Sequence, residues 1–135
     1  MGLLIDSSVL VGLERRGLHP SRLVEDDGEP LVISAVTLSE LLYGLYRAQT
    51  PAQRTRRQAF IDAVLAAFAV IPFDQMIAQV HARTWAELAA SGLTIGAHDM
   101  MIAATALAQE YAVVTENVRE FGRIPGLDVR QPAWQ

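Results

Sequence analysis

Short apolar runs alternate along the chain with longer stretches in which apolar residues recur every three or four positions. Runs of the first kind are typical of strands buried on both faces, and the longer stretches are typical of amphipathic helices. The sequence predicts strands at residues 2–5, 31–34, 69–72 and 112–115, with a candidate edge strand at 127–129. It predicts helices at residues 7–15, 21–27, 34–48, 51–68, 75–90, 98–110 and 118–121.

This alternation of strands and helices predicts a parallel sheet with right-handed crossover connections. We therefore expect an α/β fold with a central, mostly parallel four- to five-stranded sheet flanked by helices on both faces. The 135 residues contain no repeat or linker-like stretch, so we expect a single domain over residues 1–135.

Composition narrows the class of protein. Hydrophobic residues make up 51% of the chain, yet no apolar run approaches the length of a membrane-spanning helix. There is no cysteine and no pattern of a secretory leader, so we expect a cytoplasmic protein without a membrane partner. The net charge of −4 argues against a broad basic surface for nucleic acid, but not against a nuclease whose acidic residues hold cations. All 11 basic residues are arginines, which excludes any mechanism that needs a lysine.

Four polar residues occupy equivalent places beside the predicted strands. Asp6 follows the first strand and Asn117 follows the fourth. Glu40 lies in the first turns after the second strand, and Asp99 begins an alanine-rich helix. Ligands of open α/β sheets bind outside the carboxyl ends of the strands, so these four residues are expected to approach one site.

Each of these residues also fits ordinary helix capping. Asp6 and Asn117 stand where N-caps are expected, and Thr37 with Glu40 matches a capping box. Asp99 suits the positive end of its helix. Capping does not explain why Glu40 lies nearly opposite the apolar stripe of its helix, on a second, largely apolar face. We therefore expect Glu40 to be partly buried.

Three carboxylates at one edge repel one another unless a cation compensates their charge. Oxygen ligands without a histidine or cysteine cluster suit Mg²⁺ or Mn²⁺ better than zinc. Enzymes commonly use such an ion to activate water for attack on a phosphodiester. A receiver-like phosphorylation domain also places carboxylates at strand ends, but the absence of lysine and of an acidic pair after the first strand disfavours it.

The stretches around these residues resemble the four sequence blocks of PIN-domain ribonucleases, in particular the small VapC-type toxins of type II toxin–antitoxin systems. The blocks occur in the family's order and read LLIDSSVLV, VTLSELLYGL, IGAHDMMIAATAL and VVTENVREFGRIPGL. The resemblance implies a PIN-like fold and a Mg²⁺-dependent endoribonuclease, with Mn²⁺ as a substitute. It also implies RNA cleavage by metal-activated water attack that leaves 5′-phosphate and 3′-hydroxyl ends.

The resemblance also assigns residues. It implies that Asp6, Glu40 and Asp99 bind the metal, with Ser8 and Thr115 as nearby hydroxyls that support them.

The family's fourth acidic position falls on Asn117, which offers oxygen but no charge. We count Asn117 as the fourth catalytic residue, although its neutrality also leaves open a catalytically weakened PIN module that acts by binding RNA or a partner. Glu116 and Glu120 are neighbours that could substitute for the missing acid, with solvated charges at a helix end as the favoured alternative. Asn117 with Glu120 also matches a capping pattern.

Residues outside the four blocks have two interpretations each. A basic cluster near the middle of the chain and one arginine near the fourth block are candidate RNA contacts, with a solvated helix face as the alternative; they are Arg47, Arg54, Arg57 and Arg119. His98 is expected at the surface or as a cap. The aromatic residues Tyr43, Tyr46 and Trp85 are expected in the core or an interface, with stacking platforms for bases as the alternative if they lie exposed beside a basic rim.

The resemblance finally implies partners. It predicts an RNA substrate, a homodimer, and a cognate antitoxin whose segment covers the active site within a larger complex. An acidic cleft would favour a guanidinium from such an antitoxin.

Overall fold

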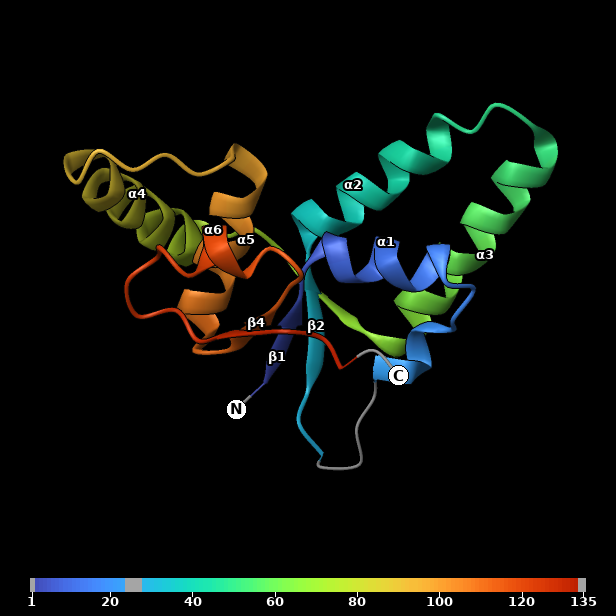
Figure 1. The fold of residues 1–135 in the computed structure, drawn as a ribbon, viewed down its shortest axis with the longest axis horizontal. Coiled ribbons are helices and arrows are strands. Elements are labelled where there is room, and N and C mark those ends of the chain that lie inside the picture. The colour runs from blue at the N-terminus through green and yellow to red at the C-terminus, as the bar shows by residue number, and fades with distance from the viewer. Residues whose placement is uncertain (1, 24–27, 134–135) are drawn as a thin grey trace.

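The computed structural model describes residues 2–23 and 28–133. Five strands within them form a parallel sheet (Figure 1). The strand order is β3-β2-β1-β4-β5, so β1 lies at the centre. The chain builds the sheet outward from β1 in one direction and later in the other, which makes the carboxyl end of β1 a topological switch point. The strands are β1 (Leu3–Ile5), β2 (Leu31–Ser34), β3 (Ala69–Ile71), β4 (Ala112–Val114) and β5 (Val129–Arg130).

Helices cover both faces of this sheet, as the sequence predicts. In Figure 1, α1, α2 and α3 lie on one side of the strands, and α4, α5 and α6 lie on the other. The helices are α1 (Ser7–Arg15), α2 (Ala35–Tyr46), α3 (Pro51–Ala67), α4 (Gln75–Ala90), α5 (Ala97–Gln109) and α6 (Val118–Phe121), with a short 3-10 helix η1 (Pro20–Leu23). None of the helices in the described part of the chain has the length and hydropathy needed to cross a membrane.

The central strand divides the core into two apolar layers. Leu3 and Ile5 point into the layer under α1, α2 and α3, whereas Leu4 points into the layer under α5. This alternation follows from the two-residue period of a strand, and it explains why β1 is apolar at every position. The strand is therefore buried up to the switch point. Asp6, the residue directly after it, is the first polar residue there.

Two predicted element boundaries differ from the structure. The predicted helix at residues 21–27 is a 3-10 turn in its described part, and residues 24–27 lie outside the described residues. The edge strand occupies Val129–Arg130 and not residues 127–129.

The predicted capping box at Thr37 is wrong. Ser34 is the N-cap of α2, and its Oγ accepts a hydrogen bond of 3.0 Å from the backbone N–H of Thr37. The helix therefore begins one turn earlier than the capping box requires, and Glu40 lies in the second turn.

Candidate functional site

Asp6 is a buried carboxylate held at the end of β1 by two hydroxyl groups. The residue is only 2% exposed. Its Oδ2 accepts hydrogen bonds from Ser8 Oγ at 2.7 Å and from Thr115 Oγ1 at 2.8 Å. Asp6 stands at the N-cap position of α1, but its side chain makes no capping hydrogen bond, so the capping interpretation is wrong. The two hydroxyls fix its orientation instead.

Thr115 connects three parts of this edge. Besides donating to Asp6, its Oγ1 accepts a 2.9 Å hydrogen bond from the backbone N–H of Asn117 and lies 3.3 Å from Ser8 Oγ. The residue is fully buried directly after β4. Both hydroxyls that the sequence analysis singled out therefore contact Asp6.

Two carboxylate oxygens at this edge are buried without a partner. Within the described residues, Asp6 Oδ1 and Glu40 Oε1 have no hydrogen bond. An unsatisfied buried acceptor costs about 1–3 kcal/mol, and more where it is charged. Both oxygens therefore gain from a cation or a donor that binds there.

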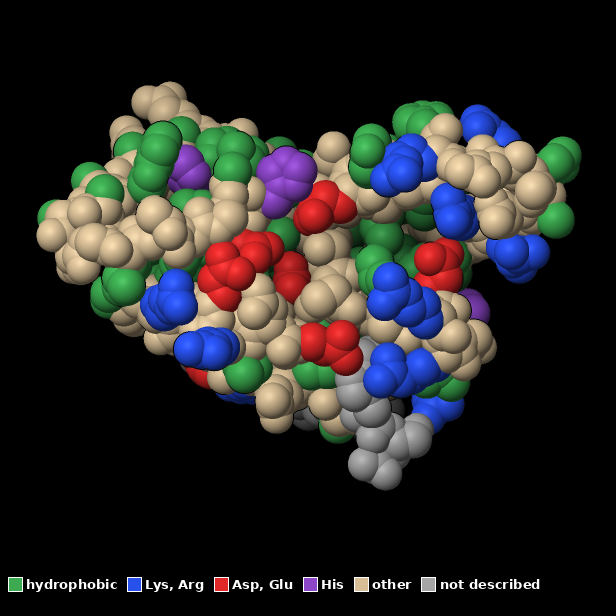
Figure 2. All heavy atoms as spheres, turned by 45° about the horizontal axis from the view of Figure 1, so that its top comes forward, with side chains coloured by type: hydrophobic (Ala, Val, Ile, Leu, Met, Phe, Trp, Pro, Cys, Tyr) green, Lys and Arg blue, Asp and Glu red, His purple; other side chains and the backbone are tan. Residues whose placement is uncertain are grey.

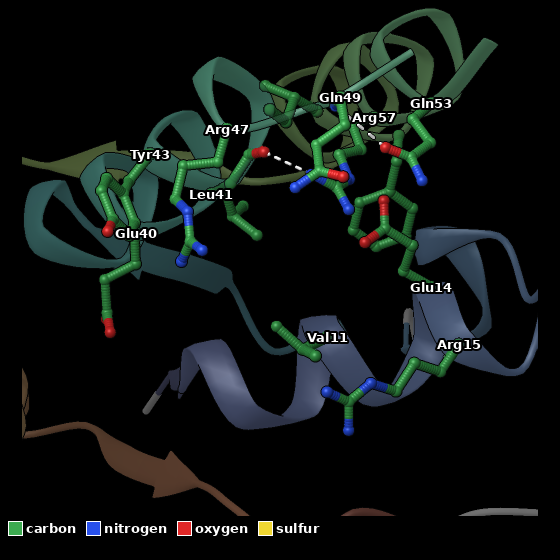
Figure 3. A pocket seen from close by; sticks show the side chains of 13 residues that line it. Val11, Glu14, Arg15, Glu40, Leu41, Tyr43, Arg47, Gln49, Gln53 and Arg57 are labelled. Atoms are coloured by element: carbon green, nitrogen blue, oxygen red, sulfur yellow. Dashed lines mark hydrogen bonds between the residues drawn. The ribbon is translucent and has the colours of Figure 1, made fainter.

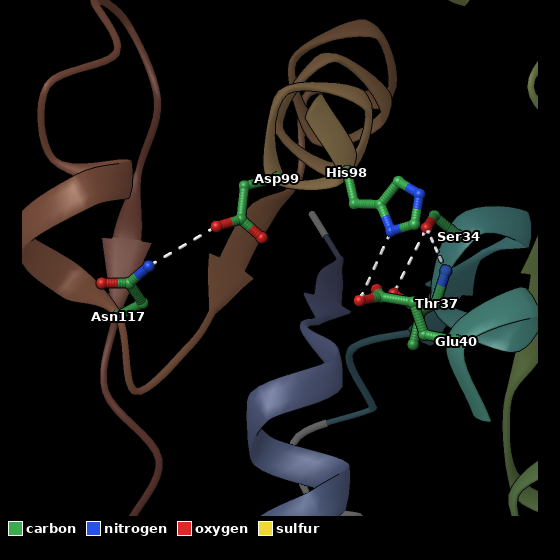
Figure 4. Close-up of polar contacts among 6 residues, drawn as sticks. All are labelled: Ser34, Thr37, Glu40, His98, Asp99 and Asn117. Atoms are coloured by element: carbon green, nitrogen blue, oxygen red, sulfur yellow. Dashed lines mark hydrogen bonds and ion pairs between the residues drawn. The ribbon is translucent and has the colours of Figure 1, made fainter. Parts of the chain in front are cut away.

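Glu40 reaches the site from α2, where it meets the start of α5. Its other oxygen, Oε2, lies 3.6 Å from His98 Nδ1, and the two side chains are 32% and 60% exposed (Figure 4). The expectation of a partly buried Glu40 and of a surface His98 is correct. Their contact depends on how α5 packs against α2, which the sequence does not reveal.

Asp99, Asn117 and Glu120 form a chain of polar contacts on the opposite side of the edge. Asn117 Nδ2 donates a 2.8 Å hydrogen bond to Glu120 Oε2. It also makes a longer contact of 3.5 Å with Asp99 Oδ2, which Figure 4 shows. Glu120 Oε1 accepts a 2.8 Å hydrogen bond from the backbone N–H of Gly96, the N-cap of α5. Glu120 therefore ties α6 to the helix that carries Asp99.

The pKa values of Asp99 and Glu120 are shifted in opposite directions. Burial raises the pKa of Asp99 from 3.8 to about 6, and repulsion from Asp6, Glu120 and Glu40 adds to the rise. The hydrogen bond from Gly96, followed by that from Asn117, lowers the pKa of Glu120. Glu120 therefore keeps its charge, whereas Asp99 takes up a proton as the pH falls through about 6.

Glu120 contacts the site through bonds that the favoured sequence interpretation did not include. Its spacing from Asn117 suggests a cap, and its place at a helix end suggests a solvated charge. Asn117 makes no capping hydrogen bond, and Glu120 bonds to a residue 24 positions earlier. Only the N-x-x-E spacing indicated that the two side chains meet.

A cleft of about 710 Å³ opens at this edge and is lined by Asp6, Ser8, Asp99 and Asn117. Val11 and Arg15 of α1 border both this cleft and a second groove of about 490 Å³ that Glu40 lines. Figure 2 shows acidic side chains gathered near the middle of this face and arginines grouped beside them. The acidic edge is thus open to solvent and has a basic border.

The donor set fits a hard divalent cation. Among the residues that the structure describes, no three acidic or histidine side chains converge into a preformed metal cluster. The acids at the edge nevertheless offer carboxylate oxygens, two of these oxygens are buried without a partner, and burial together with repulsion from the neighbouring acids raises the pKa of Asp99. Carboxylate oxygens in this state suit Mg²⁺ or Mn²⁺, which would relieve the repulsion.

The candidate RNA contacts fall into different environments. Arg57 is half-buried and donates a 2.7 Å hydrogen bond from Nη1 to the carbonyl of Gly44, so it joins α3 to α2. Arg47, Arg54 and Arg119 are exposed.

The aromatic residues Tyr43, Tyr46 and Trp85 are 63%, 67% and 62% exposed. The prediction that they belong to the core is wrong, and the alternative of an interface stays a prediction.

Comparison with known proteins agrees with this architecture. Residues 3–127 match the sequence profile of the PIN domain. The chain is 40% identical over 129 residues to ribonuclease VapC1 of Rickettsia felis, covering 96% of this chain and 95% of that protein. It is 35% identical to the tRNA(fMet)-specific endonuclease VapC of Salmonella typhimurium, covering 86% of this chain and 80% of that protein.

A solved structure extends the likeness to three dimensions. The fold superposes on DNA-bound VapBC from Salmonella typhimurium with a TM-score of 0.86 at 28% identity, covering 97% of this chain and 98% of that one. The sequence matches and the structural match therefore indicate the same family, and the parallel sheet with acidic residues at its carboxyl edge is consistent with it. The chain therefore belongs to the PIN-domain family and, within it, to the VapC ribonucleases.

Proposed function

We propose that this chain is a divalent-metal-dependent endoribonuclease that acts as the toxin of a toxin–antitoxin pair. Its family membership and the ribonuclease names of its relatives support the activity. The observation that carries the proposal is the pair of unpartnered buried carboxylate oxygens, Asp6 Oδ1 and Glu40 Oε1, at the same edge as the raised pKa of Asp99. A site built only to cap helices would not leave these oxygens unsatisfied.

Asp6, Glu40 and Asp99 would hold Mg²⁺, for which Mn²⁺ can substitute. When bound, the ion lowers the pKa of water, orients it toward phosphorus and stabilises charge on the leaving oxygen. The expected products carry 5′-phosphate and 3′-hydroxyl ends.

The protein's own contribution is orientation. Ser8 and Thr115 hold one oxygen of Asp6 and leave the other free to bind, which preorganises the ligand before substrate arrives. Asn117 donates to Glu120 and Asp99, so it positions the two carboxylates without adding charge. Asp99 must lose its proton before it binds a cation, which links activity to pH.

The proposed partners follow from the same acidic edge. The solved VapBC structure that this fold resembles supports an antitoxin partner, and an acidic cleft favours an arginine from it. We propose that such a segment covers the cleft, and that the toxin assembles as a homodimer within the complex.

Cleavage of a labelled RNA in Mg²⁺ and in EDTA tests the function. We expect Mg²⁺-dependent cleavage by the wild type and its loss in Asp6→Asn. Asp62→Asn is the matched control, because Asp62 is an exposed carboxylate on α3 that contacts only Gln58 among the described hydrogen bonds. Equal Mg²⁺-dependent cleavage by wild type and a folded Asp6→Asn protein would contradict the assignment.

The neutral Asn117 favours a second function, that of a binding module without catalysis. In that case the wild type would bind RNA or the antitoxin but cleave nothing in Mg²⁺ or Mn²⁺. The same cleavage assay therefore separates the two functions.

A further inference from the structure

Two tyrosines on α2 are exposed next to the acidic edge, and an arginine lies over each ring. Tyr43 and Tyr46 are 63% and 67% exposed. The guanidinium carbon of Arg47 lies 5.4 Å from the centre of the Tyr43 ring, and that of Arg54 lies 5.9 Å from the centre of the Tyr46 ring. We call these four residues the Tyr–Arg face.

The Tyr–Arg face is continuous with the candidate active site. Glu40 and Tyr43 are one helical turn apart on α2, and both line the 490 Å³ groove together with Arg47. Arg15 of α1 forms the facing wall of this groove and also borders the cleft that contains Asp6 (Figure 3). A strand lying on Tyr43 would therefore pass Glu40 on its way to Asp6.

Hydrogen bonds fix the corner between α2 and α3 that presents these side chains. Arg57 of α3 donates to the carbonyl of Gly44, next to Tyr43 (Figure 3). Thr50 caps α3 by accepting from the backbone N–H of Gln53, whose side chain accepts from the backbone N–H of Gln49. The tyrosines and arginines are therefore held on a rigid corner.

The chemistry of this face matches single-stranded nucleic acid. Among the described residues, no ion pair involves Arg47 or Arg54, so no carboxylate neutralises them. Flat aromatic rings stack on unpaired bases, while guanidinium groups bind phosphates and stack on rings. Two guanidinium groups without an ion pair in the described part of the chain suit the charge of a polyanion, and the exposed rings beside them suit unpaired bases.

We propose that the Tyr–Arg face binds single-stranded RNA and holds the strand as it enters the cleft past Glu40. Tyr43 stacks on a base, and Arg47 binds a neighbouring phosphate. Tyr46 and Arg54 extend the same contact away from the cleft. The inference rests on the proposed ribonuclease function, because it names the residues that position the substrate of that site.

Trp85 on α4 provides a matched comparison. It is 62% exposed, nearly the same as Tyr43, and it packs against His81 at 5.7 Å between ring centres. In the part of the chain that the structure describes, no arginine lies over its ring. Trp85→Ala therefore removes an equally exposed aromatic group without touching the Tyr–Arg face.

Fluorescence anisotropy with labelled polyuridine and polyadenosine strands, in EDTA so that neither strand is cut, tests the inference. Tyr43→Ala should weaken binding by about 5-fold to 100-fold, whereas Tyr43→Phe and Trp85→Ala should bind as the wild type does. Arg47→Ala should lower the salt dependence of binding by about one unit of its logarithmic slope. In a cleavage assay, Tyr43→Ala should raise KM and leave kcat within about twofold.

The outcomes separate the inference from the function it rests on. Strand binding that depends on Tyr43, without Mg²⁺-dependent cleavage, supports the Tyr–Arg face and contradicts the proposed function. Asp6-dependent cleavage with a KM and an RNA affinity that Tyr43→Ala leaves unchanged overturns the inference and keeps the function; the face would then serve a protein partner. Failure of the wild type to bind either strand also overturns the inference.

Discussion

The two sides of the acidic edge are built in different ways. Asp6 follows the central strand, is almost fully buried, and receives two hydroxyl hydrogen bonds. Glu40 lies on the side of a helix, is 32% exposed, and contacts an exposed histidine at 3.6 Å. The sheet thus fixes one carboxylate before any ligand binds, whereas helix packing leaves the other adjustable.

Asp99 interacts with the carboxylates of both sides. Burial raises its pKa, and repulsion from Asp6 and Glu40 raises it further. The comparison therefore assigns a separate part to each acid: Asp6 sets the geometry, Asp99 sets the pH dependence, and Glu40 completes the donor set.

The largest expected effect comes from Asp6→Asn. It removes the fixed carboxylate charge but keeps the shape, so RNA cleavage should fall by about 100-fold or more. Thermal unfolding should show that the variant is folded, because the amide oxygen can still accept from Ser8 and Thr115. If Glu40→Gln costs much more activity than Asp6→Asn, the comparison between the two sides is wrong.

The next effect is on pH. The pKa of Asp99 is raised to about 6, so the residue is protonated below that pH and must release a proton to bind a cation. Mg²⁺ affinity should therefore fall as pH falls through about 6, and bound cation should shift the midpoint lower. Titration calorimetry in two buffers of different ionisation enthalpy measures the proton released. An affinity that stays flat between about pH 7 and about pH 5 would contradict this part of the account.

A smaller effect separates the two hydroxyls that hold Asp6. Thr115 is fully buried and accepts a 2.9 Å hydrogen bond from the backbone of Asn117, whereas Ser8 is half-buried and accepts a longer 3.2 Å hydrogen bond from the backbone of Glu116. Thr115→Val should cost about 1–3 kcal/mol of unfolding free energy and about 10-fold to 100-fold in activity. Ser8→Ala should cost less in both. Denaturant unfolding and cleavage rates check the order, and the reverse order would show that the sheet does not fix Asp6.

The smallest effect is expected at His98. Its contact with Glu40 is exposed and long, and exposed ion pairs contribute no more than about 1 kcal/mol. His98→Ala should therefore change kcat/KM by less than about fivefold. A much larger loss would mean that the Glu40 side is as tightly organised as the Asp6 side.

The sequence predicted the layers of this fold well. Its parallel sheet, its covering helices and the placement of Asp6 and Asn117 after strands follow from local apolar patterns, which short buried strands and amphipathic helices express in their own residues. The capping interpretations of Asp6 and Glu40 failed, because residue type and spacing alone do not show which hydrogen bonds a side chain makes. Asp6 accepts from two hydroxyl groups instead of capping α1, and Ser34 caps α2 in place of Thr37.

Other features depend on contacts between distant segments. Glu120 joins the site through Gly96, which lies 24 residues earlier, and no local pattern indicates that bond. Tyr43 shares α2 with Leu41 and Leu45, which are buried in the core, but it lies off their stripe and its side chain stays exposed.

Binding of Mn²⁺, followed by electron paramagnetic resonance, probes the proposed metal site without any knowledge of the RNA target. We expect the wild type and Asp62→Asn to bind Mn²⁺, and Asp6→Asn and Asp99→Asn to lose this binding while remaining folded. Mn²⁺ binding by Asp6→Asn with wild-type affinity would contradict the claim that the acids at the end of the central strand form a metal site.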